Sequence, residues 1–468
     1  MLKKQIGIIG LGIMGTNLTL NFEKNGYQIS IFNRTKDKIN ELMLNYPKKN
    51  IKPYYTLKEF ISSLNHPKYI LLMVKSGKAT DETIKKLIPY LKKKDIIIDG
   101  GNTYFKDTIK RYNKLKKIGI DFIGMGISGG EEGALNGASI MPGGDKTIYN
   151  KISHFLIKIA AKKNNRSCVD YIGPNGSGHY VKMIHNGIEY GNMQLISETY
   201  NILKNILLIN NKKISKIFNK WNKKELNSYL IKITRNILKF KNKKNKYLID
   251  LILDKADNKG TGKWASISAL ELESPFSLIT EAVFNRYLSN LKEERKIASK
   301  NKKIINKKIK RIKEKIFIND LEHALYFGII ISYTQGFLLM QKASRKYKWN
   351  LNYSVIAKIF QEGCIIKAKI LNKIRSIYKK NNQIKNLLLS SFFQKKTKKY
   401  QSSIRNIIIE SIKHGIPTPT LSSALSYYDS YNSDKLPANL IQAQRDYFGN
   451  HMYERTDKKG KFHTNWKI

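Results

Sequence analysis

Five polar side chains suited to acid–base chemistry share one helical face in the stretch GHYVKMIHNGIEYGNMQL (178–195). They are Lys182, His185, Asn186, Glu189 and Tyr190. Their spacing of i, i+3, i+4, i+7 and i+8 places them in a single stripe, while the other faces carry apolar or small residues. Burying such a stripe without partners would cost several kcal/mol. The stripe therefore predicts a site for a polar ligand, with a lysine and a glutamate two turns apart.

Two glycines interrupt the same helix at positions 187 and 191. Glycine weakens a helix interior, so its presence calls for a local reason. We expect Gly187 and Gly191 to let neighbouring segments pack closely against this helix.

The segment IGIIGLGIMG (6–15) has the glycine spacing of a dinucleotide-binding turn. The first glycine allows a tight turn, the second lets the backbone approach a pyrophosphate, and the third lets the helix pack on the strand. The N-terminus of that helix offers amides to the phosphates. The predicted cofactor loop comprises Gly10, Leu11, Gly12, Ile13, Met14 and Gly15.

The second strand of this unit ends in Asn33, Arg34 and Thr35, without an acidic residue. NAD-binding turns usually place Asp or Glu there to hold the ribose hydroxyls. A carboxylate would repel a 2′-phosphate, whereas Arg34 can bind it, with Asn33 and Thr35 as further donors. The sequence therefore predicts NADP. Asn33 or Thr35 also suits a helix cap, and the two roles are compatible.

Two further strand ends, LLMVKSG (71–77) and IIDGGNT (97–103), carry small and polar residues. Ligands of open α/β sheets lie at the carboxyl ends of strands. The candidates for the cofactor site there are Val74, Lys75, Ser76 and Asn102. The glycine-rich stretch GISGGEEGALNGASIMPGG (126–144) suits a carboxylate, because glycines expose backbone amides.

These motifs lie within an alternation of apolar runs and helical patterns over the first 170 residues or so. The runs IGIIG, QISIFN, YILLMV, DIIIDG and IDFIGMGIS are typical of buried parallel strands. The alternation predicts an α/β domain with a Rossmann-type, doubly wound sheet. Later helical patterns break at NKGTGKW, LESPFS and GIPTPT. We expect an NADP-binding domain (1–177), a large all-α domain (178–434) and a C-terminal tail (435–468).

The net charge of +51 comes mostly from lysine spread along the whole chain. The densest basic runs, 239–246 and 301–315, contain no aromatic residue beyond Phe240 and lack the pattern of an RNA-binding sheet. We interpret this charge as solvated surface, without nucleic acid as a partner. Such a surface would still steer small anions toward the protein.

Other features of the chain favour a cytoplasmic protein. Its two cysteines, Cys168 and Cys364, suit a reducing compartment. The regular glycines near the N-terminus argue against a signal peptide. The most apolar stretch, 326–340, is shorter than the ~18 residues of a membrane span and predicts a buried helix.

Together the motifs resemble those of the decarboxylating 6-phosphogluconate dehydrogenases. The matching segments, in the family's order, are GLGIMG, FNRT, IIIDGGNT, SGGEEGAL, IMPGG, the stretch 178–195, NKGTGKW, LITEAVFNRY, LPANLIQAQRDYFGNH and FHTNW. They span nearly the full length, and the basic insertions between them are this sequence's own. The resemblance implies NADP-dependent oxidation of 6-phospho-D-gluconate at C3, loss of CO₂, and protonation of the enediol to ribulose 5-phosphate.

The resemblance also implies roles for single residues. Lys182 matches the family's base, and Glu189 matches the acid that protonates the enediol. Asn102 matches a residue that touches both substrate and cofactor. The matching carboxylate loop is Ser128, Gly129 and Gly130, and the matching hydroxyl ligands are His185 and Asn186.

By the same resemblance, the phosphate ligands are Tyr190, Lys259, Thr261 and Arg286. Arg445 and His451 match ligands that the family supplies from the tail of a second subunit, which implies a homodimer. No metal is implied, because a lysine does the polarising that a metal would do.

Two alternatives are open at this point. A non-decarboxylating NADP-dependent β-hydroxyacid dehydrogenase would share the glycine turn, the SGG loop and the helix lysine, but should be shorter and lack Arg286 and the tail. A basic nucleic-acid-binding protein with a relic dehydrogenase fold would have no need to retain both Lys182 and Glu189.

Overall fold

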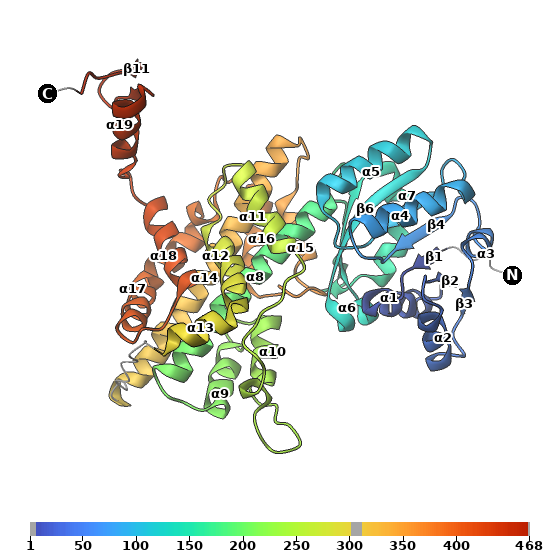
Figure 1. The fold of residues 1–468 in the computed structure, drawn as a ribbon, viewed down its shortest axis with the longest axis horizontal. Helices are drawn as coiled ribbons and strands as arrows, with labels where there is room; N and C mark the ends of the chain where they lie inside the picture. Colours follow the sequence, from blue (N-terminus) through green and yellow to red (C-terminus); the bar gives the residue numbers. More distant parts are fainter. Residues whose placement is uncertain (1–5, 301–310, 467–468) are drawn as a thin grey trace.

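A seven-stranded sheet forms the first part of the protein (Figure 1). In the computed structural model, which describes residues 6–300 and 311–466, the strand order is β3-β2-β1-β4-β5-β6-β7. The strands are β1 (Ile6–Ile9), β2 (Ile29–Phe32), β3 (Ile51–Tyr54), β4 (Tyr69–Leu72), β5 (Ile96–Asp99), β6 (Asp121–Ser128) and β7 (Ser139–Gly144). All pairs are parallel except β6 with β7. The predicted Rossmann-type fold is confirmed.

Helices cover both faces of this sheet, and alternate strand residues enter the two resulting cores. In β5, for example, Ile96 and Ile98 join one core and Ile97 joins the other. The helices are α1 (Ile13–Lys24), α2 (Lys36–Asn45), α3 (Leu57–Ser62), α4 (Lys78–Leu87), α5 (Phe105–Lys117), α6 (Gly130–Asn136) and α7 (Lys146–Ile159), with η1 (Ile88–Tyr90). A short hairpin of β8 (Lys162–Lys163) and β9 (Arg166–Ser167) follows.

The five predicted strands are present, but the sequence prediction missed both edge strands. β3 (Ile51–Tyr54) has a single fully buried residue, Ile51, and contains Pro53. β7 (Ser139–Gly144) contains Pro142 and two glycines, so the prediction treated it as part of a glycine-rich loop. Proline is tolerated on edge strands because the missing N–H faces away from the ladder. Neither strand therefore has a strong local signature.

The second part is helical, as predicted, and surrounds the long helix α8 (Ser177–Asn205) (Figure 1). The other helices are α9 (Asn211–Trp221), α10 (Tyr229–Ile237), α11 (Thr261–Glu271), α12 (Ser277–Asn290), α13 (Lys292–Ser299), α14 (Arg311–Lys346), α15 (Tyr353–Ile359), α16 (Ile370–Lys380), α17 (Ser391–Lys413) and α18 (Pro419–Tyr431), with η2 (Leu248–Asp250) and η3 (Leu387–Leu389). The three predicted breaks coincide with the starts of α11, α12 and α18. Most of the basic run 301–315 lies outside the described residues.

Helix α14 contains the apolar stretch that the sequence predicted to be buried. By length and composition its segment 314–346 could cross a membrane, yet 89% of its most apolar window is buried inside the fold. Its neighbours are α8, α17 and α18. The buried-helix prediction is confirmed.

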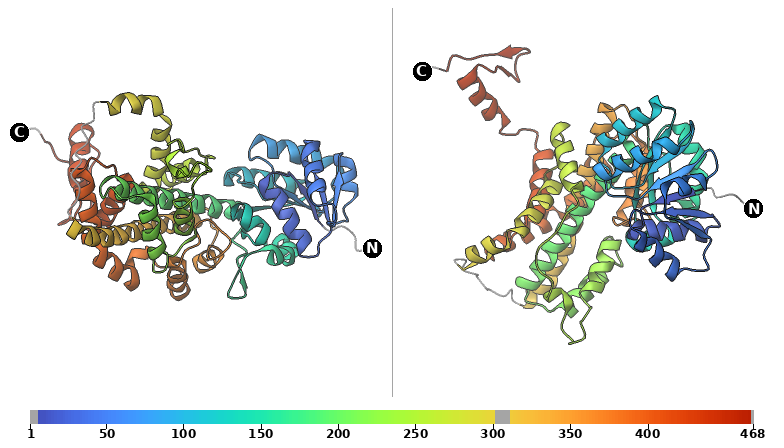
Figure 2. Two further views of the ribbon diagram at one scale, coloured as in Figure 1. Left: turned by 90° about the horizontal axis from the view of Figure 1, so that it is seen from below. Right: turned by 45° about the vertical axis from the view of Figure 1, so that its right-hand side comes forward.

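The last segment forms a small folded unit that projects from the helical part (Figure 1 and the right-hand view of Figure 2). It consists of α19 (Ala438–Gly449) and a hairpin of β10 (Tyr453–Glu454) and β11 (Lys461–Phe462). The carboxylate of Asp446 is its centre and accepts hydrogen bonds from His463 Nδ1 (3.0 Å) and Trp466 Nε1 (2.8 Å). Burial opposes these bonds, yet they lower the pKa of Asp446 to about 2.

Candidate active site

The polar stripe of α8 forms a connected cluster on the helix. Lys182 Nζ donates to Asn186 Oδ1 at 2.6 Å and lies 3.5 Å from His185 Nδ1. Glu189 Oε2 lies 3.9 Å from His185 Nδ1 on the next turn. Lys182 and His185 are buried, whereas the Glu189 side chain is 22% exposed. The amine and the carboxyl group thus flank a histidine and an asparagine on one surface.

Burial changes the protonation of this cluster. It lowers the pKa of Lys182, with the charge of Glu189 acting in the opposite direction. It raises the pKa of Glu189, against the charges of Lys182, Arg286 and Lys259. Burial and the Lys182 amine hold the pKa of His185 well below its usual value. Burial thus shifts Lys182 toward its neutral form and Glu189 toward its protonated form, the directions that suit a base and an acid.

Strand β6 delivers the glycine-rich turn to this cluster. A Cβ on Gly126 would lie 2.3 Å from Lys182 Cβ, so the strand contacts α8 directly at the lysine. Ser128, the last residue of β6, places its Oγ 3.1 Å from His185 Nε2. Gly129 and Gly130 follow at φ +140° and +60° and begin α6. The glycine-rich turn therefore begins beside the stripe.

The end of the stripe at Tyr190 gathers the groups that suit a phosphate. The guanidinium of Arg286 (α12) lies 3.6 Å from the centroid of the Tyr190 ring and donates to the Asp257 carbonyl at 2.9 Å. Thr261, the first residue of α11, accepts a hydrogen bond from Asn186 Nδ2 at 3.1 Å. Lys259 is exposed two residues earlier. A helix N-terminus with adjacent cations is a suitable environment for a phosphate dianion.

Three predicted ligands, Asn102, Arg445 and His451, take no part in the contacts described above. Asn102 is exposed after the end of β5, the strand next to β6 in the sheet. Arg445 and His451 lie on the projecting tail, where Arg445 donates to Gln442 Oε1 at 3.2 Å. Within one chain the tail does not approach α8 (Figure 1).

The predicted cofactor loop borders a cavity of about 490 Å³ at the carboxyl ends of β1, β2 and β4. A Cβ on Gly12 would meet no atom within 4 Å, whereas one on Gly15 would lie 1.9 Å from the Gly10 carbonyl oxygen. Gly12 therefore leaves room for a close ligand, and Gly15 allows the helix to contact the turn. The predicted residues that line this cavity are Gly10, Leu11, Gly12, Asn33, Arg34, Thr35, Val74 and Lys75.

Asn33 lines the cavity and also makes hydrogen bonds that connect the surrounding backbone segments. Its Oδ1 accepts from Leu11 N at 3.0 Å and its Nδ2 donates to the Thr35 carbonyl at 2.9 Å. Thr35 is the N-cap residue of α2, but its side chain makes no capping hydrogen bond. Arg34 and Thr35 are exposed, so these two side chains are free to meet a 2′-phosphate. The charge of Arg34 and the open space beside Gly12 suit the phosphates of NADP.

Sequence reasoning missed several residues that border the two sites. The cofactor cavity is also lined by Ala79, Glu82, Thr83 and Lys86 of α4. Their i, i+3, i+4, i+7 spacing was a readable signal of one exposed helical face. Behind the glycine turn, the carbonyl of Gly363 would lie 2.7 Å from a Cβ on Gly129. That contact joins residues more than 200 positions apart and left no local signal.

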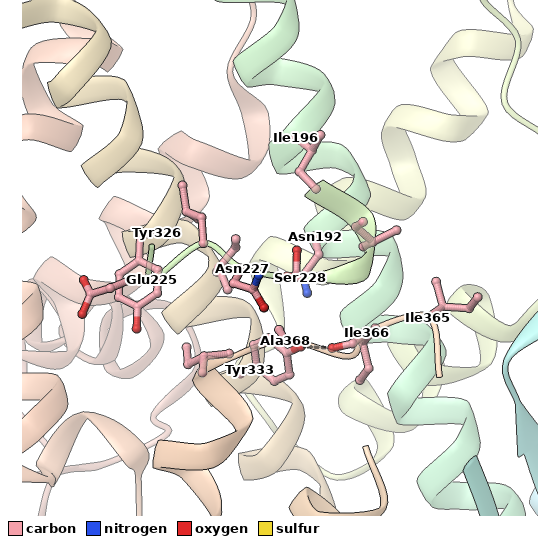
Figure 3. A pocket seen from close by; sticks show the side chains of 14 residues that line it. Asn192, Ile196, Glu225, Asn227, Ser228, Tyr326, Tyr333, Ile365, Ile366 and Ala368 are labelled. Carbon is pink, nitrogen blue, oxygen red and sulfur yellow. Dashed lines mark hydrogen bonds between the residues drawn. The ribbon is translucent and has the colours of Figure 1, made fainter. Parts of the chain in front are cut away.

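A separate cavity of about 20 Å³ lies between α8, α14 and the segments 225–228 and 365–370 (Figure 3). The Tyr333 hydroxyl donates to the Ile366 carbonyl at 2.6 Å at its wall. This space holds roughly one water molecule, and none of the predicted site residues lines it. Within residues 6–300 and 311–466, no group of three His, Cys, Asp or Glu side chains is arranged to hold a metal ion.

Comparison with known proteins agrees with this geometry. Residues 5–173 match the NAD binding domain of 6-phosphogluconate dehydrogenase, and residues 178–466 match the C-terminal domain of that enzyme. The chain is 59% identical to "6-phosphogluconate dehydrogenase, decarboxylating" of Buchnera aphidicola subsp. Acyrthosiphon pisum and 53% identical to that of Escherichia coli K12, over the full length of all three chains.

A solved structure extends the similarity to three dimensions. The 6-phosphogluconate dehydrogenase of Plasmodium falciparum, described in its apo form and in complexes with NADP⁺ and with 6-phosphogluconate, is 44% identical. The match has a TM-score of 0.95 and covers 99% of this chain and 100% of that one. The chain belongs to the 6-phosphogluconate dehydrogenase family.

Proposed function

We propose that the protein oxidises 6-phospho-D-gluconate with NADP⁺ and releases CO₂ and D-ribulose 5-phosphate. The observation that carries this proposal is the cluster on α8, where Lys182 and Glu189 lie two turns apart. Roughly 10 Å of helix separates their backbones, which lets the two side chains address different carbons of one sugar acid. A glycine turn lies beside the lysine, and cations flank Tyr190.

Lys182 acts as the base. With its pKa lowered by burial, the neutral amine takes the proton from the C3 hydroxyl. When bound, NADP⁺ supplies the acceptor for the C3 hydride. The resulting ammonium of Lys182 then donates a hydrogen bond to the C3 carbonyl oxygen and stabilises the negative charge that develops there as CO₂ leaves.

Glu189 acts as the acid that completes the reaction. Burial raises its pKa and so favours the protonated carboxyl group, which delivers its proton to C1 of the enediol. As C1 gains this proton, the hydroxyl proton that the former C3 oxygen took from the Lys182 ammonium returns to the amine, and the enediol becomes ribulose 5-phosphate. The remaining substrate ligands are Asn102, which touches both substrate and cofactor, Ser128, Gly129 and Gly130 at the carboxylate, His185 and Asn186 at the hydroxyls, and Tyr190, Lys259, Thr261 and Arg286 at the phosphate.

The NADP site comprises the turn and the strand ends around the large cavity. Its residues are Gly10, Leu11, Gly12, Ile13, Met14, Gly15, Asn33, Arg34, Thr35, Val74, Lys75, Ser76 and Asn102. The positive charge of Arg34 and the lack of a carboxylate at the end of β2 support NADP over NAD.

We also propose that the protein is a cytoplasmic homodimer and that its tail completes the partner's site with Arg445 and His451. Support comes from the apolar residues that α19 leaves more than half exposed, which are Leu440, Ile441, Tyr447 and Phe448. Phe284 and Leu288 are equally exposed on α12, the helix that carries Arg286. Apolar patches of this kind usually mark protein interfaces. The two buried free cysteines suit the reducing cytoplasm.

The decisive test follows NADPH and CO₂ together after 6-phosphogluconate and NADP⁺ are added to the full-length protein. Equal amounts of both products are expected. NADPH without CO₂ would favour a non-decarboxylating β-hydroxyacid dehydrogenase. If neither NADPH nor CO₂ is formed, the proposal is overturned. Truncation after Tyr431 should raise the KM for 6-phosphogluconate; an unchanged KM would show that the tail does not contribute to the phosphate site.

A further inference from the structure

A buried charged cluster lies at the carboxyl ends of β4 and β5. Arg111 of α5 and Asp99 of β5 are 6% and 1% exposed. Arg111 donates through Nη1 to Asp99 Oδ2 (3.4 Å), through Nε to Asp81 Oδ1 (2.7 Å) and through Nη2 to the Gly77 carbonyl (3.1 Å). We call Arg111, Asp99, Asp81 and Gly77 the strand-end brace.

The brace holds the segment that follows β5. Asp99 Oδ1 accepts from the backbone N–H of Gly101 at 3.1 Å, and Oδ2 accepts from Thr103 Oγ1 at 2.8 Å. Segment 100–103 has no helix or strand of its own. Its conformation, and with it the position of Asn102, therefore depends on this carboxylate.

The other arm of the brace holds the segment that follows β4. Gly77 has φ +83° and caps α4, and its carbonyl is bound by Arg111. Segment 73–77 also lacks regular structure, and Thr80 Oγ1 donates to the Lys75 carbonyl at 3.0 Å. A Cβ on Gly101 would lie 3.2 Å from the Val74 carbonyl oxygen. The two segments therefore lie against each other at Gly101 and Val74.

Helix α8 reaches the same place through His179, one turn before Lys182. Its ring is buried, with Nδ1 2.7 Å from Thr108 Oγ1 of α5. Burial lowers the pKa of His179, although the Asp99 charge and the carbonyls of Asp99 and Gly101 raise it. The helix that carries the base is thus packed against α5, the helix that carries Arg111.

Stability alone is a poor reason for such a cluster. Replacing a buried ion network by apolar residues is often neutral or stabilising, because desolvation offsets the attraction between charges. What a guanidinium adds is direction, since its planar fork bonds several acceptors in fixed geometry. Here the acceptors include the Asp99 carboxylate, directly before segment 100–103, and the Gly77 carbonyl, at the end of segment 73–77. Both segments are proposed to contact the cofactor. Hydride transfer is sensitive to such placement, and a 1 Å error costs about 10²-fold in rate.

We propose that Arg111 is a positioning residue for hydride transfer, which holds segments 73–77 and 100–103 in register so that Lys75, Ser76 and Asn102 meet cofactor and substrate correctly. This inference rests on the proposed NADP-linked oxidation. Arg111 itself touches neither ligand and acts through Asp99 and Gly77.

The test compares Arg111→Met with Lys68→Met. Lys68 and Asp95 form a buried ion pair (3.4 Å; 7% and 0% exposed) at the opposite ends of the same two strands. It is a matched control, because both variants remove a buried cation from one pair of neighbouring strands. Arg111→Met should lower kcat by about 10²-fold and enlarge the isotope effect of substrate deuterated at C3. Lys68→Met should retain kcat and the isotope effect.

A readout without ligand separates positioning from loss of stability. In the ligand-free protein, amide hydrogen exchange of segments 73–77 and 100–103 should accelerate in Arg111→Met and stay unchanged in Lys68→Met. Arg111→Lys should recover little of the lost kcat, because an ammonium does not reproduce the fork. Equal kcat in Arg111→Met and Lys68→Met, or unchanged exchange in both segments, would overturn the proposal.

If Arg111→Met does not fold, the variant Asp81→Asn tests the positioning role of Arg111 instead. Asp81 is 59% exposed at its side chain, and the amide keeps its shape while weakening one arm. A lower kcat at unchanged Tm supports the brace, and wild-type kcat contradicts it. A wild-type protein that forms no NADPH from 6-phosphogluconate would instead refute the proposed function, so the two failures are distinguishable.

Discussion

Lys182 combines two properties that a catalytic base needs, a lowered pKa and a fixed direction. Burial lowers the pKa, and the hydrogen bond to Asn186 Oδ1 aligns the amine along the polar stripe. Glu189 has the complementary property of a raised pKa on the next turns of α8. The environment thus brings both groups toward their neutral forms, which separates the roles of base and acid.

Removal of the amine should stop oxidation without preventing cofactor binding. In Lys182→Met, NADPH formation from 6-phosphogluconate should fall by about 10²–10⁴-fold, because no other residue of the stripe carries an amine. NADP affinity, measured by titration, should be unchanged, since Lys182 does not line the cofactor cavity. Lys106→Met is a suitable control, because it removes a partly exposed lysine paired with Glu271. NADPH formation at the wild-type rate would disprove the base assignment.

Asn186, the hydrogen-bond partner of Lys182, allows the base assignment to be tested through the pH dependence of kcat/KM. In Asn186→Asp a carboxylate replaces the acceptor 2.6 Å from Lys182 Nζ and should raise the pKa of the lysine. The proposed base acts as a neutral amine, so the acidic limb of the kcat/KM profile should move to higher pH. Asn186→Ser removes the bond without adding charge and should lower kcat/KM without the upward shift. An unmoved limb in Asn186→Asp would contradict the assignment.

The stripe could be predicted from sequence because helical period is a local property. Its partners could not, since Ser128 reaches His185 across 57 positions and Thr261 reaches Asn186 across 75. Asn33 has a further contact for which the sequence holds no local signal. Its Oδ1 accepts a hydrogen bond from Leu11 N across 22 positions, and this contact arises only when β1 and β2 pair.

At the scale of elements, α8 is the framework on which both parts of the protein meet. Its first turns contact β6 and β7, and its later turns pack on α11, α12 and α14. The strong periodic helices and buried parallel strands were predictable, because each has a long run of consistent residues. The edge strands β3 and β7 were not, because proline, glycine and partial exposure leave no strand pattern.

The two glycines of α8 make a matched pair for testing how tightly this framework is packed. A Cβ on Gly191 would lie 2.8 Å from Ser332 Oγ and 2.9 Å from Leu278 Cδ2, whereas one on Gly187 would meet Phe276 at 3.3 Å and Ala265 at 3.4 Å. Close packing is confirmed at both positions and is tighter at Gly191.

Replacing glycine by alanine stabilises the helix by about 1 kcal/mol at either position. This gain is the same in Gly187→Ala and Gly191→Ala, so it does not contribute to the difference between their free energies of unfolding. Overpacking at Gly191 costs about 1–3 kcal/mol, and urea unfolding should show Gly191→Ala to be less stable than Gly187→Ala by that amount. Equal free energies of unfolding would mean that the helices around α8 separate without strain.

At the scale of the molecule, the tail is the part whose structure is least explained by its own chain. It has an internal centre in Asp446, yet α19 leaves its apolar residues exposed and projects from the helical part (Figure 1). Composition could predict that this segment is ordered, because it is rich in aromatic residues. Where it docks could not be predicted from periodicity, since docking depends on a surface outside the segment.

Mixing two inactive variants tests whether the tail serves a second subunit. Lys182→Met removes the base, and Arg445→Met removes a proposed phosphate ligand of the neighbouring site. If the two homodimers are dissociated and re-associated at random, half of the dimers are mixed. In each mixed dimer one site carries both defects and the other carries neither. Activity at low substrate concentration should therefore return to about a quarter of the wild-type value.

The same mixture distinguishes a tail that acts within its own chain. In that arrangement every site of a mixed dimer carries one defect, so no activity would return. Each variant re-associated with itself is the control and should remain inactive. Recovery in the mixture alone requires two chains to build one site. The exposed face of α19 would then be the contact that makes the enzyme's activity depend on dimer formation.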